Sequence, residues 1–567
     1  MTSAAAGPLR NIDFDYGDFA VRAPVIRVEE DTVIAMDPTR QRLVLVGVVF
    51  FLAFVTLALR LLQLAVFGHD ESDAAGRLVP PASTRAEVVD RNGQMLITNL
   101  KVASLYANPN EVWDVDETVS KLAGIFPNLD TGRLKGRLST DRQFEWIERD
   151  LAPHERDAVY SLGLPGLHFA DEPRRFYVQG RTLSHVLGFV DPDNNGLAGL
   201  ELKLDDRLTS GGVAPVELAI DLGTQHAVRD ELAAAMTRFS ATGAAGIVMD
   251  VNTGEVLALV SLPDFDPVEP GKAPSDALFN RATLGVFEMG STFKILTTAV
   301  ALDSGKATLR SSFDASRPIR VGGFTISDYH AENRWLTVPE IFVHSSNIGS
   351  AKMVLSVGVD AHRAFLQKLG LFEKPGIELA EVGAPLVPSP WREITSMTVS
   401  FGHGMAVSPI QLVKAVGAMV NGGRLIEPTL LKRSPGAQVP YRQVIKPQVS
   451  DELRGLLRSV VTDGTGRQAD VPGYSIGGKT GTAEKVVDGK YKKNALMSSF
   501  VAIFPSRAPR YVVYVVLDEP KGIAETHNFA TAGWTAAPTA AAVIRRIAPI
   551  LRVAPVEKPD ASKLKAH

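Results

Sequence analysis

Short apolar runs stand out in the C-terminal half of the chain. The runs at 246–251 (GIVMDV) and 256–261 (VLALVS) are separated by NTGE, and those at 499–504 (SFVAIF) and 511–517 (YVVYVVL) by PSRAPR. Turn-forming residues between two apolar runs predict β-hairpins. Because the apolar residues are consecutive rather than alternating, both faces of the resulting sheet should be covered by helices.

Between the two hairpins the pattern predicts a block of helices, and one more helix follows the second hairpin. The predicted helices are 291–303, 339–357, 361–369, 409–421, 451–461 and 536–547. Two hairpins that are far apart in the sequence, with helices between them, predict an antiparallel sheet completed by the end of the chain. The predicted fold class is α+β.

A different pattern marks the N-terminal region. Residues 43–59 (LVLVGVVFFLAFVTLAL) carry no charge, and the apolar character continues to Phe67. At ~1.5 Å per residue the uncharged part covers roughly 25 Å, and the extension reaches the thickness of a bilayer core. We therefore predict one transmembrane helix at 43–67. A cleaved signal peptide is disfavoured because the apolar region is too long and a polar segment of residues 1–42 precedes it.

The segment before this span, residues 1–42, is predicted to be a cytoplasmic tail. Arginines lie on both sides of the span, at Arg40, Arg42, Arg60 and Arg77, so the positive-inside signal is weak. The large portion that follows the span is expected on the other side of the membrane.

Residues 77–213 mix short strands, charged segments and glycine-rich turns, which is typical of an extended accessory domain. DRNG predicts a tight turn between strands at 88–90 and 95–98, and the charged segment 139–148 is predicted to be a helix. TSGGVAP at 209–215 marks a boundary. A second, larger domain is then expected at 214–550, followed by a disordered tail at 551–567.

Composition excludes several classes of protein. The net charge is −3 over 567 residues, and no basic stripe with interleaved aromatic residues is present, so nucleic acid binding is not expected. The absence of cysteine excludes disulfides, cysteine zinc sites and thiol nucleophiles. The histidines show no HExxH motif, and we expect neither a metal site nor a cofactor.

The stretch FEMGSTFKILTTAV (287–300) contains Ser291 three residues before Lys294. By itself this pair has an ordinary interpretation, a helix cap beside a surface lysine. HSSNIG (344–349) places Ser345 and Asn347 early in a predicted helix, where Ser345 would also serve as a cap.

A third motif, IGGKTGTAEK (476–485), contributes Lys479, Thr480, Gly481 and Thr482. With Gly473 it formally satisfies the phosphate-binding pattern G-x-x-x-x-G-K-T. That pattern requires a strand before the loop and a helix after it. RQADVP before Gly473 does not resemble a strand and GTAEKVVDGKYKK is a poor helix, so nucleotide binding is disfavoured.

The order S-x-x-K, S-x-N, K-T-G is far more specific than any one member. It is the signature shared by β-lactamases and penicillin-binding proteins, and it predicts serine acyl-transfer chemistry. On a helix Ser291 and Lys294 share one face. The N-terminal end of the helix and a partly desolvated pocket would favour a neutral Lys294 that accepts the serine proton.

The remaining motif residues have matching tasks. Ser345 and Asn347 would supply a hydroxyl relay and an amide that fixes the substrate. Lys479, with the hydroxyls of Thr480 and Thr482, would bind a terminal carboxylate. Gly481 would allow the substrate backbone to approach the strand edge closely.

From about residue 40 to 550 the chain resembles class B penicillin-binding proteins, the membrane-anchored peptidoglycan D,D-transpeptidases. The resemblance rests on the three motifs, the apolar anchor, DRNG, HVLGFV, GLAGLE, AGIVMDVNTGEVLALVS and NRAT. It implies a penicillin-binding transpeptidase domain with a five-stranded antiparallel sheet flanked by helices, behind a transmembrane helix and an elongated mixed α/β pedestal. GKTGT would lie on an edge strand.

The resemblance also implies a mechanism. Ser291 would attack the penultimate D-alanine carbonyl of a stem peptide, and the amino group of a neighbouring stem would accept the acyl group. The backbone N–H groups of Ser291 and Thr482 would form the oxyanion hole. β-Lactams would be covalent inhibitors, and the expected partners are the membrane, a membrane glycosyltransferase and other divisome proteins. No cofactor is implied.

Within this family the chain is most similar to the septal, division-specific type, through its acidic N-terminal tail, SFGHGMAVSPIQL and TAGWTAAP. The implied location is the bacterial cytoplasmic membrane, with a periplasmic catalytic domain. The elongation-type enzyme, a β-lactam sensor and a divisome scaffold without turnover remain alternatives. Met289 and Ile295 stand where the family often has proline, and the absence of E-x-x-L-N after Asn347 argues against a β-lactamase.

Overall fold

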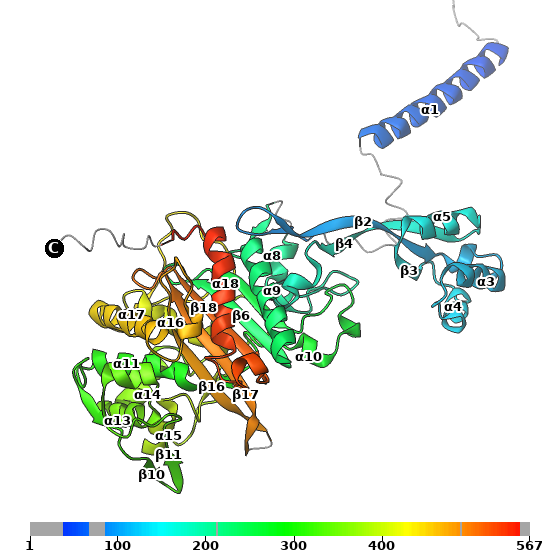
Figure 1. Ribbon diagram of the computed structural model, residues 1–567. Coiled ribbons are helices and arrows are strands. Elements are labelled where there is room, and N and C mark those ends of the chain that lie inside the picture. Colours follow the sequence, from blue (N-terminus) through cyan, green and yellow to red (C-terminus); the bar gives the residue numbers. More distant parts are fainter. Residues whose placement is uncertain (1–37, 67–84, 211–213, 488–489, 556–567) are drawn as a thin grey trace, which may run out of the picture. The chain divides into compact units, whose positions relative to one another are not determined.

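The computed structural model describes residues 38–66, 85–210, 214–487 and 490–555. The chain divides into two units, 1–78 and 79–567. In the first unit, helix α1 (Pro38–Val66) covers the predicted helical segment 43–67 almost completely (Figure 1). Within the described residues, no helix combines the length and apolar character needed to cross a membrane. Most of the predicted tail 1–42 and most of the predicted tail 551–567 lie outside the described residues.

The second unit contains the predicted five-stranded antiparallel sheet. Its strand order is β16-β17-β18-β6-β7, and every neighbouring pair is antiparallel. The strands are β16 (Gly477–Val487), β17 (Lys490–Phe504), β18 (Tyr511–Asp518), β6 (Gly243–Asp250) and β7 (Val256–Leu262). Both predicted hairpins are therefore confirmed, and β18 joins the second hairpin to the first.

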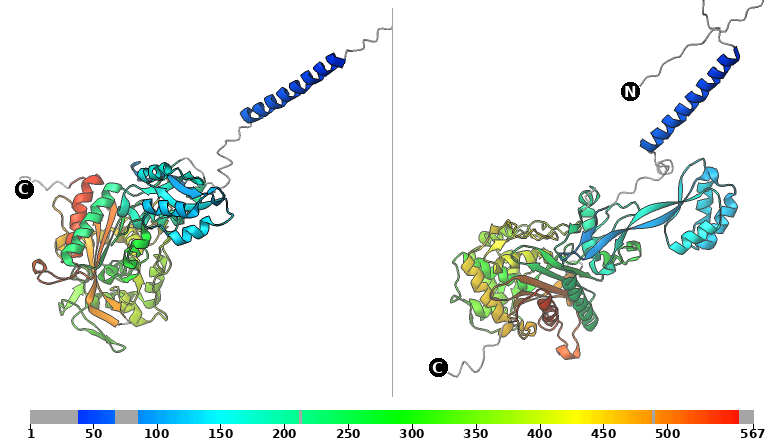
Figure 2. Two further views of the ribbon diagram at one scale, coloured as in Figure 1. Left: turned by 90° about the vertical axis from the view of Figure 1, so that its right-hand side faces the viewer. Right: turned by 90° about the horizontal axis from the view of Figure 1, so that it is seen from above.

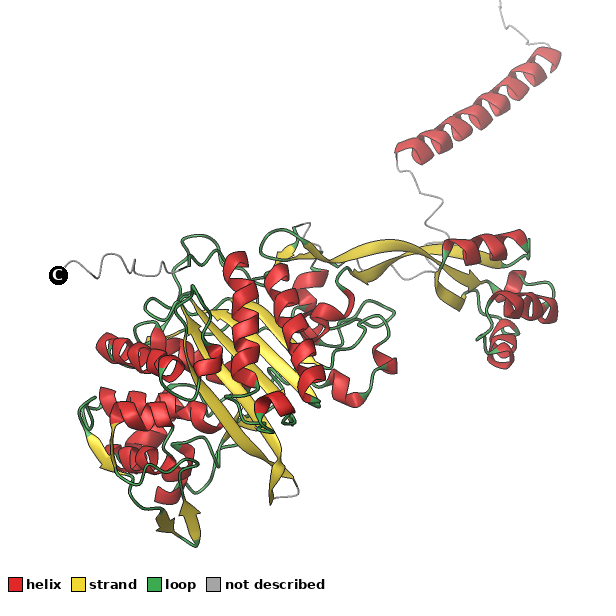
Figure 3. Cartoon of the chain, viewed as in Figure 1, coloured by secondary structure: helices red, strands yellow, loops and turns green. Residues whose placement is uncertain are grey.

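Helices cover both faces of this sheet, as its continuous apolar runs require. Every residue of β18 and of β7 is buried. Helices α9 (Leu222–Phe239) and α18 (Ala536–Ile550) pack on one face, where Figure 3 shows them side by side across the strands. Helices α11 (Lys294–Asp303), α16 (Pro409–Val420) and α17 (Pro447–Thr462) contribute to the core on the other face.

Two predicted helices differ from the observed ones at the motif residues. The segment 291–303 begins as a 3₁₀ turn, η4 (Gly290–Phe293), before α11. The segment 339–357 is not continuous, because Ser345 has a left-handed backbone (φ 60°, ψ 42°) and ends α12 (Val338–His344). Helix α13 (Asn347–Val357) then begins as a separate helix, with Ser346 as its N-cap.

The pedestal is built on a long antiparallel ribbon of β2 (Met95–Ala107) and β4 (Leu167–Tyr177), which Figure 2 shows extending from the sheet-bearing part of the same unit. Strand β1 (Val88–Val89) precedes the DRNG turn, and β5 (Val216–Glu217) pairs with it in parallel. Small helices at the far end, α3 (Val115–Ile125), α4 (Thr131–Leu138) and α5 (Pro153–Ser161), enclose a separate apolar cluster.

The predicted helix at 139–148 is wrong. Strand β3 (Glu145–Leu151) occupies its second half and pairs with β2. Glu145, Ile147 and Leu151 are buried, an alternation that suits a strand although the charged residues favour a helix. Pairing with the neighbouring strand outweighs local propensity here.

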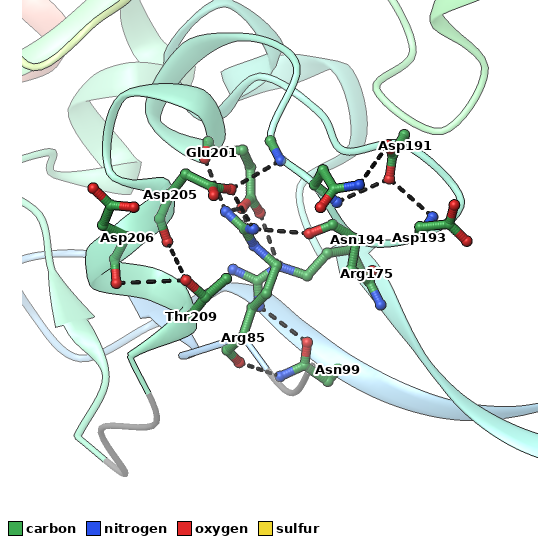
Figure 4. Close-up of polar contacts among 12 residues, drawn as sticks. Arg85, Asn99, Arg175, Asp191, Asp193, Asn194, Glu201, Asp205, Asp206 and Thr209 are labelled. Carbon is green, nitrogen blue, oxygen red and sulfur yellow. Dashed lines mark hydrogen bonds and ion pairs between the residues drawn. The ribbon is translucent and has the colours of Figure 1, made fainter. Parts of the chain in front are cut away.

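A buried polar network holds the base of the pedestal together (Figure 4). Arg85 donates to the carboxylate of Glu201 at 2.8 Å, and Arg175 donates to the other oxygen of the same carboxylate at 2.8 Å. Arg85 also donates to Asp205 at 2.7 Å. From the catalytic domain, the carboxylate of Glu381 accepts the N–H of Gly199 at 3.1 Å. The short helix α7 (Gly199–Lys203), which carries both Gly199 and Glu201, is therefore tied to both parts of the unit.

Candidate active site

The turn that carries Ser291 is held by backbone-to-backbone packing. Gly290 has φ +53°, and its N–H donates to the carbonyl of Gly402 at 3.1 Å. A Cβ on Gly402 would lie 2.0 Å from the carbonyl oxygen of Gly290, and one on Gly290 would lie 2.6 Å from that of Thr482. Only glycine fits at these positions. The nucleophile candidate is thereby fixed between strand β16 and the loop at Gly402.

Lys294 connects the first two motifs. Its Nζ lies 2.8 Å from Ser291 Oγ, 2.7 Å from Asn347 Oδ1, and 2.7 Å from the carbonyl oxygen of Ser345. Ser345 Oγ lies 3.1 Å away. The left-handed backbone of Ser345 turns both its carbonyl and its hydroxyl towards the lysine, which a continuous helix would not do.

Lys479 reaches the same hydroxyl from strand β16, because its Nζ lies 2.9 Å from Ser345 Oγ. Ser345 therefore lies between two amino groups. The structure thus brings together Ser291, Lys294, Ser345, Asn347 and Lys479, which belong to three motifs that are far apart in the sequence.

Both lysines are almost completely buried, with exposed fractions of 1% for Lys294 and 0% for Lys479. Burial lowers the pKa of Lys479 to about 7. Burial, and then the nearby charge of Lys479, lower the pKa of Lys294 well below its usual value, while Asp328 opposes the shift. Two ammonium groups that share one desolvated site disfavour each other's charge.

The contacts of Lys294 suit a neutral amine. An uncharged amine has two N–H donors and one lone pair. The carbonyl of Ser345 and Oδ1 of Asn347 can only accept, so they take both donors. Asn347 Nδ2 donates to the carbonyl of Ser327 at 3.0 Å, which fixes the orientation of the amide. The lone pair then remains for the hydroxyl of Ser291.

The residues after Lys479 make contacts that the sequence did not predict. The hydroxyl of Thr480 lies 2.8 Å from that of Thr465, and the hydroxyl of Thr482 accepts the N–H of Ala532 at 3.1 Å. Each hydroxyl keeps hydrogen-bonding capacity for a ligand. A Cβ on Gly481 would lie 2.7 Å from the carbonyl oxygen of Met289, so Gly481 admits the protein's own nucleophile turn.

Further residues around the site escaped the sequence analysis. Asp328 binds the first residues of α13, and neither its position nor its spacing forms a known motif. His403 lies beside Phe401 and Tyr491, with ring centroids 5.4 and 6.0 Å away, and burial lowers its pKa. Tyr491 donates to Glu288 at 3.0 Å. In the sequence, His403 is marked only by the stretch SFGHGM (400–405), which resembles the family.

The structure also bears on nucleotide binding and metal binding, which the sequence disfavours. The GKT of the apparent phosphate loop lies inside strand β16 and does not open a helix. Among the described residues, no group of three or more histidine, aspartate and glutamate side chains is arranged to hold a metal ion.

The family description "Penicillin binding protein transpeptidase domain" matches residues 244–544, and "Penicillin-binding Protein dimerisation domain" matches residues 80–211. The chain is 42% identical over 529 residues to "Probable peptidoglycan D,D-transpeptidase FtsI" of Caulobacter vibrioides, covering 91% of this chain and 90% of that protein. It is 32% identical to "Stage V sporulation protein D" of Bacillus subtilis, covering 85% and 81%.

Solved structures show the same fold. Penicillin-binding protein 3 of Mycobacterium tuberculosis, in complex with aztreonam, matches with a TM-score of 0.66 at 24% identity, covering 84% of this chain and 98% of that one. The transpeptidase domain of penicillin-binding protein 3 from Burkholderia pseudomallei matches with a TM-score of 0.54 at 32% identity, covering 60% and 98%.

Proposed function

This chain belongs to the penicillin-binding protein transpeptidase family, and from that premise we propose that it is a septal peptidoglycan D,D-transpeptidase. The observation that carries the proposal is the contact of Lys294 Nζ with Ser291 Oγ at 2.8 Å, in a site where burial lowers the pKa of the lysine. A neutral buried amine beside a serine hydroxyl is the arrangement of an activated nucleophile.

The proposed acylation step follows from these contacts. Lys294 takes the proton of Ser291 while the serine oxygen attacks the penultimate D-alanine carbonyl. The backbone N–H groups of Ser291 and Thr482 stabilise the oxyanion. When the C–N bond breaks, Ser345 passes a proton from Lys294 to the departing D-alanine nitrogen. The amino group of a second stem peptide then attacks the acyl-serine and gives its proton through Ser345 to Lys294. Lys294 passes a proton to the Ser291 oxygen as the ester bond breaks.

Lys479 is the proposed partner of the substrate's terminal carboxylate, together with Thr480 and Thr482. A bound carboxylate would compensate the buried charge that the free site holds poorly. Gly481 serves this subsite indirectly, because it lets strand β16 lie against the turn at Met289.

The septal assignment rests on similarity to the FtsI proteins, at 42% identity for that of Caulobacter vibrioides and 29% for that of Escherichia coli K12. A relative named for sporulation is 32% identical to this chain, so similarity of this degree is not confined to proteins named for division. The elongation role, the β-lactam sensor and the scaffold without turnover are the competing functions.

We further propose a single-pass protein of the cytoplasmic membrane. Residues 1–42 would be the cytoplasmic tail and 43–67 the anchor; residues 77–213 would be the pedestal and 214–550 the catalytic domain, both periplasmic, with a tail at 551–567. The uncharged segment 43–59, whose large apolar side chains from Leu45 to Leu59 are exposed, supports an anchor. A membrane glycosyltransferase and other divisome proteins are the proposed partners. Protease added to spheroplasts should digest the catalytic domain and spare the cytoplasmic tail at residues 1–42.

The decisive test is labelling by a fluorescent penicillin, followed by cross-linking of peptidoglycan strands in vitro. Wild-type protein should be labelled and should form cross-links, and Ser291→Ala should do neither. Labelling without cross-links would favour the sensor. A Ser291→Ala variant that still supports division would favour the scaffold.

A further inference from the structure

Asp328 follows strand β11 (Phe324–Ile326) and lies 19 residues before Asn347 in the sequence. Its Oδ1 accepts the N–H groups of Asn347 at 2.6 Å and Ile348 at 2.9 Å, and its Oδ2 accepts the hydroxyl of Ser346 at 2.7 Å. The neighbouring carbonyl of Ser327 accepts the side-chain amide of Asn347 at 3.0 Å. Two consecutive residues thus make four hydrogen bonds to the second motif.

These bonds are more than an ordinary helix cap. Helix α13 already has its cap, because Ser346 Oγ accepts the N–H of Gly349 at 2.9 Å. Asp328 takes the N–H groups that this cap leaves free, where a carboxylate is favoured. The result is that both the backbone and the amide of Asn347 are fixed from outside the helix.

What Asp328 holds is the part of the site that faces Lys294. Ser345 has a left-handed backbone, which an L-residue adopts only when its surroundings impose it. Its carbonyl oxygen and Oδ1 of Asn347, each 2.7 Å from Lys294 Nζ, are the acceptors that orient the amine. Asp328 binds Ser346, Asn347 and Ile348, which are the three residues directly after Ser345.

We propose that Asp328 is a positioning residue for the acyl-transfer reaction: through its bonds to Ser346, Asn347 and Ile348 it holds the second motif against Lys294, and its negative charge favours the protonated form of that lysine. The inference rests on the proposed function of the site. Asp328 does not touch Ser291, so it acts through Lys294 and Asn347.

The electrostatic side of the proposal can be separated from the structural side. The charged or titratable groups around Lys294 are Lys479 on β16, Asp328 in the loop after β11, and His403 in the loop before β13 (Ala406–Val407). Lys479 lowers the pKa of Lys294 and Asp328 raises it. Removing the carboxylate charge should therefore make Lys294 lose its proton at a lower pH.

The experiment measures the second-order acylation rate of the full-length protein with a penicillin between pH 5 and 9, for Asp328→Asn, Asp328→Ala and a control. Asp328→Asn keeps a carbonyl acceptor but no charge, so its maximal rate should stay within about tenfold of wild type while the rising acid limb moves to lower pH. Asp328→Ala should lose about tenfold or more of the maximal rate, since the acceptors of Lys294 are no longer held.

Glu340→Gln is the matched control. Glu340 also has its carboxylate at a helix N-terminus, where it accepts the N–H of Thr337 in front of α12. Within the described residues, this carboxylate makes no hydrogen bond to Ser345, Ser346 or Asn347. Its pH profile should match wild type. Wild-type rates for Asp328→Ala, or an unmoved acid limb for Asp328→Asn, would overturn the proposal. Absence of acylation at Ser291 in the wild type would instead overturn the proposed function.

Discussion

The pedestal and the active site each bury a pair of cations, and they treat the charges differently. In the pedestal, Arg85 and Arg175 share the carboxylate of Glu201, whose side chain is 0% exposed. In the active site, Lys294 and Lys479 share the hydroxyl of Ser345. Among the described residues, no carboxylate lies within 4.0 Å of either lysine amine, a distance that defines an ion pair.

The difference follows from what each pair must do. A guanidinium keeps its proton at any working pH, so a buried arginine needs a compensating carboxylate. A lysine amine can lose its proton, and burying it without an ion-pair partner lowers its pKa until it becomes a base. The pedestal network stabilises one arrangement of the chain, whereas the active site retains an unfavourable charge that substrate and reaction can use.

Exchanging the type of cation in the active site should have the largest effect. Lys294→Arg keeps the charge but cannot accept a proton, so acylation by a penicillin should fall roughly 10²–10⁴-fold. Lys294→Ala should behave similarly, and the exposed control Lys306→Ala should do little. The rate is measured on protein whose folding is checked by thermal melting. An arginine variant within about tenfold of wild type would mean that Ser291 has another base.

Removing the compensation in the pedestal should come next. Glu201→Gln leaves two buried guanidinium groups without their shared anion, and urea unfolding of the purified protein should show a loss of about 3–5 kcal/mol. The acylation rate of the folded protein should stay the same. Glu217→Gln, which removes an exposed partner of Lys432, is the control. A loss below about 1 kcal/mol for Glu201→Gln would mean that Glu201 does not compensate the buried charges of the two arginines.

The pH dependence of acylation tests whether the two lysines have different charge states. Acylation requires neutral Lys294, so the rate should rise as pH passes the lowered pKa of Lys294. It requires charged Lys479, so the rate should fall as pH passes about 7, the pKa of Lys479 in the free protein. A substrate with an amidated terminal carboxylate should react roughly ten- to a hundredfold more slowly and should lack the falling limb. Equal rates for amidated and free substrates at every pH would exclude Lys479 as the carboxylate site.

The smallest effect is expected where a cation is neither buried nor catalytic. Arg546 pairs with Asp230 at 3.0 Å and with Glu231 at 3.1 Å, and its side chain is 41% exposed. Arg546→Ala should change the free energy of unfolding by about 1 kcal/mol or less, with the acylation rate unchanged. Urea unfolding measured beside Glu201→Gln gives the comparison. A loss as large as that of Glu201→Gln would show that burial does not explain the pedestal result.

The sequence predicted the sheet well because its strands are apolar on both faces, a pattern that few other elements share. It also predicted which motif residues lie together, since the order of the three motifs identifies the family. It missed strand β3, because the charged residues around Trp146 favour a helix by local propensity. Pairing with β2 makes the segment a strand in the folded chain. It also missed the break at Ser345, because a left-handed serine has no local signal when the contacts that impose it come from elsewhere.

Asp328 shows the same limit at the site itself. Its bonds to Asn347 and Ile348 join segments 19 and 20 residues apart, and no spacing rule links a carboxylate to a helix N-terminus over that distance. Gly481 was predicted to make room for substrate, but its contact is with the turn at Met289. Such packing depends on the folded chain as a whole.

The glycines that allow close backbone packing around Ser291 have an evolutionary consequence. Gly290, Gly402 and Gly481 each meet backbone atoms at distances that a Cβ cannot occupy. Any nucleotide change that replaces one of these glycines adds a side chain and moves the turn that carries Ser291 away from strand β16. This part of the protein therefore tolerates almost no substitution. A bacterium under selection by a β-lactam must therefore vary the rim of the site. The rings of His403 and Tyr491 lie beside the site, with centroids 6.0 Å apart, and we expect substitutions there to change the affinity for the drug while cross-linking survives.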